Sequence, residues 1–298
     1  MKVIIAGGSG LVGQRLTQHL EQKGAEVLWL SRNQNLDRSV YWDPARGEID
    51  IEALESCYAV VNLAGAGIAD ERWSEERKQL ILDSRVQSTE LLVQTIGKLK
   101  SKPRVLVNAS AHGIYQQGLE KPCNEGGPHG DNFLAEVCKA WEAAAKSVTK
   151  LGVRLAIIRI SVVLDPDGGA LAKMLPPFKM GAGGPAGSGK QMMSWIHRDD
   201  LVAILHQAIT NDAYTGVINA VALRPISNAD FGKTLGKVLK RPAFTPAPTF
   251  ALKIAFGEMA EQTILADLGV VSSKLPELQF SWKYPDLEGA LRELLEKA

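Results

Sequence analysis

The sequence predicts an α/β fold, in which a doubly wound parallel sheet is followed by a smaller, mostly helical C-terminal lobe. Over roughly the first 160 residues, short apolar runs alternate with longer segments of helical apolar spacing. The chain opens with one such run, which breaks into glycines and resumes as a helical pattern. Beyond about residue 165, glycine and proline interrupt the alternation, so a second structural region is expected there.

Five apolar runs have the length and composition of buried strands, and they are residues 2–6, 26–30, 59–63, 104–109 and 154–160. Helical patterns lie between most of them, at residues 11–23, 74–99 and 133–150. Strands that alternate with helices form a parallel sheet covered on both faces. Because such crossovers are right-handed, the predicted core is a Rossmann-type sheet.

The predicted domains are discontinuous in sequence. Residues 193–208 return to a strand followed by a helix, so this segment is expected to rejoin the first domain. We therefore expect residues 1–165 with about 191–222 to form the Rossmann domain. About 166–190 with 223–298 would form a substrate-binding lobe, with Gly183 and Gly184 near the cleft between them.

Composition restricts the class of partner. The 298 residues carry 34 basic and 33 acidic side chains, which leaves no basic surface for nucleic acid or anionic membranes. The three cysteines are widely spaced, so neither a disulfide framework nor a metal site is predicted. No signal peptide or membrane span is evident. The expected protein is cytoplasmic and binds a small molecule.

The opening glycines have the spacing of a dinucleotide-binding turn. Gly7, Gly10 and Gly13 join a first strand to a first helix, where backbone amides and the helix dipole attract a diphosphate. The predicted diphosphate contacts are Gly7, Gly8, Ser9, Gly10, Leu11, Val12 and Gly13. The alternative is an ordinary strand-to-helix turn.

The end of the second strand indicates which nicotinamide cofactor is bound. Ser31 and Arg32 stand there, and no carboxylate follows until Asp37. An acidic residue would accept from a ribose hydroxyl, whereas arginine accommodates a 2′-phosphate. This favours NADP(H), although Arg32 could also be a solvated loop residue. Residues at the end of the third run, Asn62, Leu63, Ala64 and Gly65, are expected beside the adenosine and ribose. Gly65 and Gly67 could equally be turn glycines.

Several longer strings resemble a known family. They are residues 65–74 (GAGIADERWS), 133–142 (FLAEVCKAWE), 173–178 (KMLPPF) and 187–197 (GSGKQMMSWIH). Together with the glycine turn, they resemble atypical short-chain dehydrogenase/reductases of the extended type, in the "epimerase family" branch. The resemblance spans essentially the whole chain and implies NADP(H) binding with an undefined reaction.

The resemblance also implies a catalytic Tyr-x-x-x-Lys pair, which this chain lacks. None of its five tyrosines is followed by lysine four residues later. Lys139 stands on the expected helix, but Ala135 precedes it by four residues. If the helix is aligned on Glu142 instead, Cys138 takes the lysine position and Leu134 the tyrosine position. A conventional ketoreductase or epimerase mechanism is therefore in doubt.

Candidate reacting groups follow the fourth strand. Ser110 stands at the carboxyl edge of the predicted sheet, and Tyr115 is a candidate for a displaced proton donor, with Lys139 near the ribose. Tyr115 could instead be a wall residue that is hydrogen-bonded at one end. Arg72, Trp73 and Arg85 form a possible site for a negatively charged substrate.

Two further patterns are assigned structural roles. Asp199 and Asp200 follow His197 at the start of an apolar helix, where they suit its N-cap and first turn. The segment before Lys190 resembles a phosphate-binding loop of nucleotide triphosphatases, but Gln191 replaces the required serine or threonine. It is predicted to be a flexible loop over the cleft.

Two functions fit these observations. The first is an NADP(H)-dependent oxidoreductase or epimerase that acts on a small, unidentified substrate. The second is a catalytically inactive NADP(H)-sensing protein, for which the resemblance implies a link to cell division. By analogy with the superfamily, residues 74–99 and 133–150 could pair subunits in a homo-oligomer.

Overall fold

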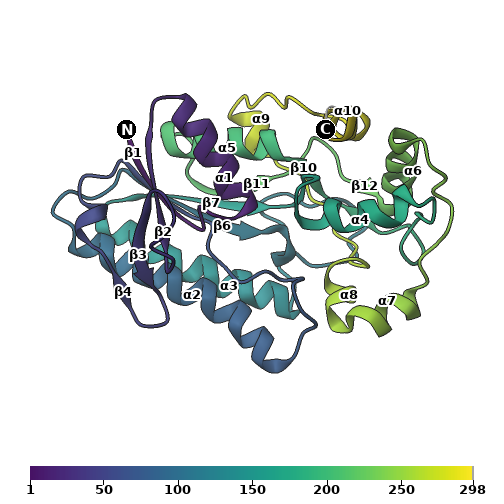
Figure 1. Cartoon of the computed structure of the whole chain (residues 1–298), viewed down its shortest axis with the longest axis horizontal. Helices are drawn as coiled ribbons and strands as arrows, with labels where there is room; N and C mark the ends of the chain where they lie inside the picture. Colours follow the sequence, from purple (N-terminus) through teal and green to yellow (C-terminus); the bar gives the residue numbers. More distant parts are fainter. Residues whose placement is uncertain (297–298) are drawn as a thin grey trace.

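In the computed structural model, which describes residues 1–296, helices cover both faces of an eight-stranded sheet, and a mostly helical region lies beside it (Figure 1). The sheet strands are β1 (Lys2–Ala6), β2 (Glu26–Ser31), β3 (Ser39–Asp43), β4 (Glu48–Ile49), β5 (Ala59–Asn62), β6 (Val105–Ala111), β7 (Arg154–Ile160) and β11 (Gly216–Ala220). The last two residues of the predicted lobe, 297–298, lie outside the described residues.

The strand order is β11-β7-β6-β5-β1-β2-β3-β4, and only β4 is antiparallel to its neighbour. The chain builds outward from β1 toward β2, then returns to place β5 on the other side of β1. In an open parallel sheet, ligands bind at the carboxyl ends of the strands where the order reverses in this way. The predicted doubly wound fold is confirmed, and its crevice lies between β1 and β5.

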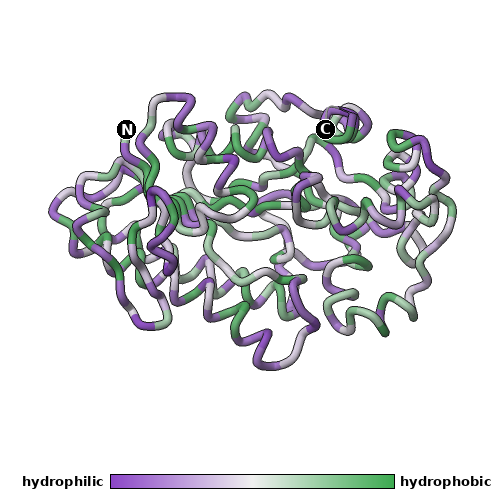
Figure 2. Tube along the Cα trace, viewed as in Figure 1, coloured by the Kyte–Doolittle hydropathy of each residue, from purple (hydrophilic) through white to green (hydrophobic). Residues whose placement is uncertain are grey.

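Alternating side chains of β1 separate the two faces of the sheet. Val3 and Ile5 pack in the core under α1 (Leu11–Gln22) and α5 (Arg198–Thr210). Ile4 and Ala6 face α2 (Glu75–Lys98) and α3 (Phe133–Lys146). The period of two in a strand makes each apolar residue of this run serve one of the two layers. Figure 2 shows the resulting hydrophobic residues along the central strands.

The second region has its own hydrophobic core. Trp195, Phe231, Leu235 and Leu291 are among its buried residues. The core is assembled from α4 (Gly169–Lys179), α6 (Asn228–Leu239), α10 (Leu287–Glu296), β8 (Val162–Leu164) and β10 (Trp195–His197). The remaining strands and α-helices are β9 (Met192–Met193), β12 (Ile226–Ser227), α7 (Thr249–Phe256), α8 (Glu258–Gln262) and α9 (Lys274–Glu277). Short 3-10 helices span Glu52–Leu54, His112–Ile114 and Ser147–Leu151. The mostly helical C-terminal lobe is thus confirmed, whereas its proposed boundaries stay a prediction.

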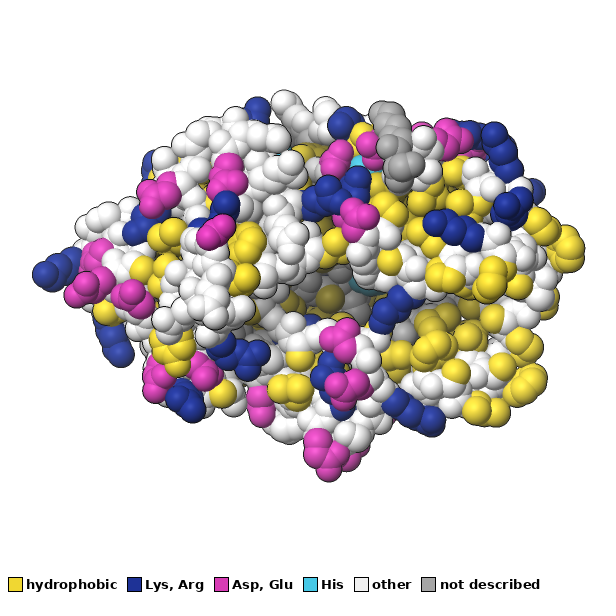
Figure 3. Space-filling view, viewed as in Figure 1, with side chains coloured by type: hydrophobic (Ala, Val, Ile, Leu, Met, Phe, Trp, Pro, Cys, Tyr) yellow, Lys and Arg dark blue, Asp and Glu magenta, His cyan; other side chains and the backbone are white. Residues whose placement is uncertain are grey.

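Helix α7 lies on the outside of this lobe. None of its residues is buried, and Phe250 and Ile254 are about 70% exposed. Phe244, just before it, is 80% exposed. Figure 3 shows the hydrophobic surface that such residues leave at this end of the molecule. Among residues 1–296, no helix is long and apolar enough to cross a membrane.

Candidate functional site

The glycine turn between β1 and α1 has no room for side chains. A Cβ on Gly7, whose φ is +80°, would lie 2.8 Å from the carbonyl carbon of Leu63. A Cβ on Gly13 would lie 2.3 Å from the Gly7 carbonyl oxygen. Gly10 is the N-cap of α1 and provides no capping side chain, so the first amides of the helix are free for an anion. This turn therefore fits the diphosphate of a dinucleotide.

Gly8 has a different neighbour. A Cβ there would lie 2.1 Å from the ring of Trp29, which stands on β2. Ser31 ends the same strand, and its hydroxyl accepts a hydrogen bond from the backbone of Asn33 at 3.0 Å. Arg32 is exposed next to it. The structure thus places Ser31 and Arg32 at the carboxyl end of β2, beside the glycine turn.

Asn62 and Gly65 both contact other parts of the protein interior. Asn62 is fully buried, and its amide donates to Thr89 and to Asn108, both at 2.8 Å. These bonds tie β5 to α2 and β6. A Cβ on Gly65 would lie 2.9 Å from the guanidinium carbon of Arg85. The absence of a side chain at Gly65 therefore makes room for Arg85.

A buried polar network lies at the carboxyl ends of β6, β7 and β11. Arg159 donates to both carboxylate oxygens of Glu142, at 2.7 and 2.9 Å. Ser110 donates to the same carboxylate at 2.8 Å. Arg159 also donates to the Tyr115 hydroxyl at 2.8 Å, and that hydroxyl donates to Asn219 at 2.7 Å. These five side chains are at most 3% exposed.

The network fixes the state of Tyr115. Its side chain is fully buried, and burial raises the pKa of the phenol to about 12, although the Arg159 charge opposes this. Burial also opposes the charge of Arg159, but the hydrogen bonds and charge of Glu142 outweigh it and raise the pKa of the guanidinium. Tyr115 therefore stays protonated at neutral pH, with its hydroxyl engaged on both sides. This geometry favours the wall-residue interpretation of Tyr115.

Lys139 is not brought to Ser110. Its ammonium pairs with Glu136 at 2.7 Å on the exposed side of α3. Cys138 is 4% exposed, and burial raises the pKa of its thiol to about 11, while the Ala111 backbone and the Ser110 hydroxyl oppose this. The alignment on Glu142, which puts Cys138 in the lysine position, is thus the one in which the helix faces Ser110.

The three residues predicted to bind an anion, Arg72, Trp73 and Arg85, have different partners in the structure. Arg72 donates to the Ile254 carbonyl at 3.1 Å and so joins the segment before α2 to α7. Trp73 donates to the Ile68 carbonyl at 2.8 Å and packs edge-on against Phe133. Arg85 is buried on α2. Arg72 therefore contacts α7, Trp73 packs on α3, and no hydrogen bond joins either of them to Arg85 among the described residues.

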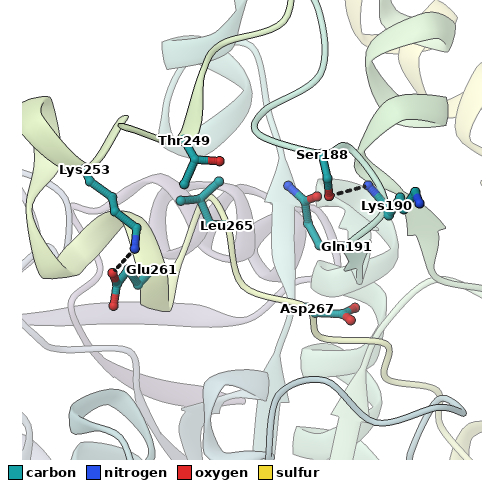
Figure 4. A pocket seen from close by; sticks show the side chains of 8 residues that line it. All are labelled: Ser188, Lys190, Gln191, Thr249, Lys253, Glu261, Leu265 and Asp267. Carbon is teal, nitrogen blue, oxygen red and sulfur yellow. Dashed lines mark hydrogen bonds and ion pairs between the residues drawn. The ribbon is translucent and has the colours of Figure 1, made fainter. Parts of the chain in front are cut away.

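A cavity of about 480 Å³ lies in the C-terminal lobe (Figure 4). It is lined by Ser188, Lys190, Gln191, Thr249, Lys253, Glu261, Leu265 and Asp267. Lys253 and Glu261 form an ion pair of 2.6 Å at one wall. Gly183 and Gly184 are not among the lining residues. They pack against Phe178 and the Thr245 backbone, where a Cβ would collide. On the face drawn in Figure 3, the molecule is also hollowed near its centre.

His197, Asp199 and Glu293 bring one ligand atom each within 4.8 Å of one another. The imidazole has no free nitrogen, however, because Nδ1 accepts from the Asp199 backbone at 3.1 Å and Nε2 faces Glu293 at 3.0 Å. His197 is the N-cap of α5, and Asp199 and Asp200 occupy its first turn. The capping role predicted for this segment thus belongs to the histidine.

Three residues of the network, Arg159, Asn219 and Glu142, were not predicted as site residues. Arg159 and Asn219 are polar positions in the mostly apolar strands β7 and β11. A buried arginine in a strand needs a carboxylate, and Glu142 was available on the predicted helix. The Arg159–Glu142 pair could therefore have been predicted from the need of a buried arginine for a carboxylate.

The sheet order, the glycine turn at its switch point and the helical lobe define an extended short-chain dehydrogenase/reductase. The family model of the NAD dependent epimerase/dehydratase family matches residues 3–220, and a "Domain of unknown function" model matches residues 247–294. The chain belongs to the NAD dependent epimerase/dehydratase family, which confirms the resemblance seen in its sequence.

Relatives match over the full length. The "Epimerase family protein SDR39U1 homolog, chloroplastic" of Arabidopsis thaliana is 41% identical over 99% of this chain and 87% of that protein. The crystal structure of human epimerase family protein SDR39U1 (isoform2) with NADPH is 36% identical, with a TM-score of 0.92 and all of both chains covered. The Thermus thermophilus UDP-glucose 4-epimerase complex with NAD superposes with a TM-score of 0.78 over 99% of this chain and 98% of that chain, at 18% identity, which shows the fold alone.

Proposed function

We propose that this protein binds NADP(H) at the β1/β5 switch point and acts on a small substrate as an oxidoreductase or epimerase. The observation that carries the proposal is the glycine turn, where Gly7 and Gly13 leave no space for a side chain beside free helix amides. The full-length human relative whose structure is described with NADPH supports the same cofactor.

Each part of the cofactor has a corresponding part of the chain. Residues 7–13 would hold the diphosphate, and Ser31 with Arg32 would hold the 2′-phosphate. Leu63, Ala64 and Gly65 would lie along the adenosine side. When bound, NADP(H) supplies the capacity to donate or accept a hydride, and the protein supplies orientation.

The residues expected beside the nicotinamide ring distinguish the two candidate functions. Ser110 lies at the carboxyl edge of β6 but already donates its hydroxyl proton to Glu142. Its remaining lone pairs can still accept a hydrogen bond from a substrate hydroxyl. Tyr115 and Lys139 have other partners. Because the chain lacks the standard Tyr-x-x-x-Lys pair, a cofactor-sensing protein without catalysis is the second candidate function.

An activity screen separates the two. The purified protein would be incubated with NADPH and panels of aldehydes, ketones and nucleotide sugars, while cofactor absorbance and sugar composition are followed. Turnover that is lost in Ser110→Ala supports the enzyme, with Lys139→Met as the matched control that should change it less than twofold. Turnover that is also lost in folded Tyr115→Phe would return the proton-donor role to Tyr115. Tight NADPH binding without turnover supports the sensor.

A further inference from the structure

Arg85 is a buried cation without a counter-charge. Arg85 stands on α2 and is 8% exposed. Its guanidinium forms no ion pair within residues 1–296. Nη1 donates to two backbone carbonyls, those of Ala66 at 3.0 Å and Ile81 at 2.9 Å. The other buried arginine, Arg159, has a two-point bond to Glu142. A buried charge is costly unless it is paired, so we expect Arg85 to have an anionic partner.

The Nε and Nη2 atoms of Arg85 have the geometry to bind an anion. Because Nη1 is taken by the two carbonyls, the edge formed by Nε and Nη2 has no acceptor in the described part of the chain. That edge presents two parallel N–H groups, which match the two oxygens of a carboxylate or a phosphate.

A second donor without an acceptor lies beside it. The guanidinium carbon of Arg85 is 5.2 Å from the centre of the Trp141 ring, on α3. Trp141 is 6% exposed, and its buried indole Nε1 has no hydrogen-bond partner among residues 1–296. An unsatisfied buried donor is costly, so such groups normally have partners. Burial also lowers the pKa of Arg85, because desolvation opposes the charge of the guanidinium.

The location connects these donors to the cofactor crevice. Arg85 lies under Gly65, whose Cβ would be 2.9 Å from Cζ and 3.1 Å from Nε. Gly65 follows the carboxyl end of β5, which borders the switch point. An anionic group that binds beside the cofactor at this edge of the sheet would therefore lie close to Arg85.

We propose that Arg85, together with the Trp141 indole, binds an anionic oxygen group, a carboxylate or a phosphate, at the cofactor crevice. The inference rests on the proposed NADP(H) site. The anion belongs either to the cofactor itself or to an acidic substrate. Both sources present the same chemistry to the guanidinium edge, and the experiment below separates them.

Arg77 provides the matched control. It stands on the same helix and also supports the segment after β5, since it donates to the Gly67 carbonyl at 2.6 Å. Unlike Arg85, it has acidic partners, Asp70 at 3.4 Å and Glu71 at 3.6 Å. Arginine-to-lysine changes at the two positions should therefore have equal effects on the loop but different effects on anion binding.

The test measures two affinities in wild type, Arg85→Lys and Arg77→Lys. The first is for NADPH, by calorimetry, and the second is for inorganic phosphate and malonate, by thermal shift with and without NADPH. If the anion is a substrate group, phosphate or malonate stabilises wild type and Arg77→Lys, and Arg85→Lys weakens that binding about tenfold. If the anion belongs to the cofactor, Arg85→Lys weakens NADPH binding about tenfold and the small anions have no effect.

Equal affinities of wild type and Arg85→Lys for NADPH and for both anions would overturn the proposal. If Arg85→Lys fails to fold, Trp141→Phe keeps an aromatic ring at this position and removes Nε1. The smaller ring should lower the unfolding temperature, and the variant, still folded at the titration temperature, should bind the same ligand at least threefold more weakly. Unchanged affinity would again overturn the proposal. Failure of wild type to bind NADPH contradicts the proposed function instead, and the anion titration of the free protein still tests Arg85.

Discussion

Arg159 and Glu142 form a two-point ion pair in which each side chain is 3% exposed, and it joins β7 to α3 directly beneath Ser110. The pair connects the reacting end of the predicted cofactor site to Tyr115 and Asn219. Because these groups satisfy one another, the network holds the carboxyl ends of three strands in a fixed arrangement.

Removal of one member should be more damaging than removal of both. Glu142→Ala leaves Arg159 buried and unpaired, so the free energy of unfolding should fall by about 3–5 kcal/mol. Glu142→Leu combined with Arg159→Met should recover part of this loss. Chemical denaturation measures both, and a loss below about 1 kcal/mol for Glu142→Ala would show that the pair is solvated in solution.

Tyr115→Phe should act on stability and leave the cofactor bound. The substitution leaves Arg159 and Asn219 each without one partner, which should cost about 1–3 kcal/mol. The dissociation constant for NADPH should change less than twofold. A large loss of NADPH affinity with normal stability would mean that the hydroxyl reaches the cofactor.

Gly13→Ala should weaken NADPH binding at least tenfold, because the new Cβ would lie 2.3 Å from the Gly7 carbonyl oxygen and must displace the turn. Gly97→Ala in α2 is the control, since its Cβ would make an ordinary contact at 3.6 Å and alanine favours a helix by up to about 1 kcal/mol. Calorimetry should show the control unchanged. Equal affinities of the two variants would argue against the glycine turn as the diphosphate site.

Arg32→Ala should reduce the preference for NADPH over NADH, since the proposed partner of the lost guanidinium is the 2′-phosphate, which NADH lacks. The exposed Arg46, in the turn between β3 and β4, is the control, and its alanine variant should keep the wild-type ratio of the two dissociation constants. If Arg32→Ala keeps that ratio as well, Arg32 does not select the cofactor.

Acid should destabilise the protein below about pH 6.5. Burial lowers the pKa of all five histidines, His19, His112, His129, His197 and His206, below the ordinary value of 6.5. The unfolded chain therefore binds more protons than the folded chain as pH falls through 6.5, and each additional proton contributes about 1.4 kcal/mol per pH unit.

Urea midpoints at pH 7.5 and 5.5 measure this effect. The midpoint should be lower at pH 5.5, and His129→Gln, which removes the imidazole beside Arg159, should reduce the difference. Equal midpoints, or a higher one at pH 5.5, would contradict the direction of these pKa shifts.

Features encoded within one segment were predictable from sequence. The bounds of β1 and β7 agree with the apolar runs, since both strands are buried on both faces. The glycine turn was visible because its geometry depends on a few consecutive residues. Strand β3 was missed, as its residues Ser39–Asp43 are mostly only partly buried and show no continuous apolar run.

Features that depend on pairing between segments were not predictable. The direction in which the Lys139 side chain points depends on how α3 is rotated about its axis. Consecutive residues of a helix point in directions about 100° apart, so Cys138 and Lys139 face different surroundings. That rotation turns Cys138 toward Ser110 and leaves Lys139 with Glu136. Likewise, nothing local indicates that Tyr115 would meet Asn219, which is 104 residues away.

The central claim is that the opening turn holds a phosphorylated nicotinamide nucleotide. Calorimetric titration of folded wild type and Gly13→Ala with NADPH and NADH tests it most directly. We predict binding of one NADPH per chain, tighter than NADH, with at least tenfold weaker binding in the variant. An absence of binding heat with both nucleotides, in their reduced and oxidised forms and at two temperatures, would contradict the account.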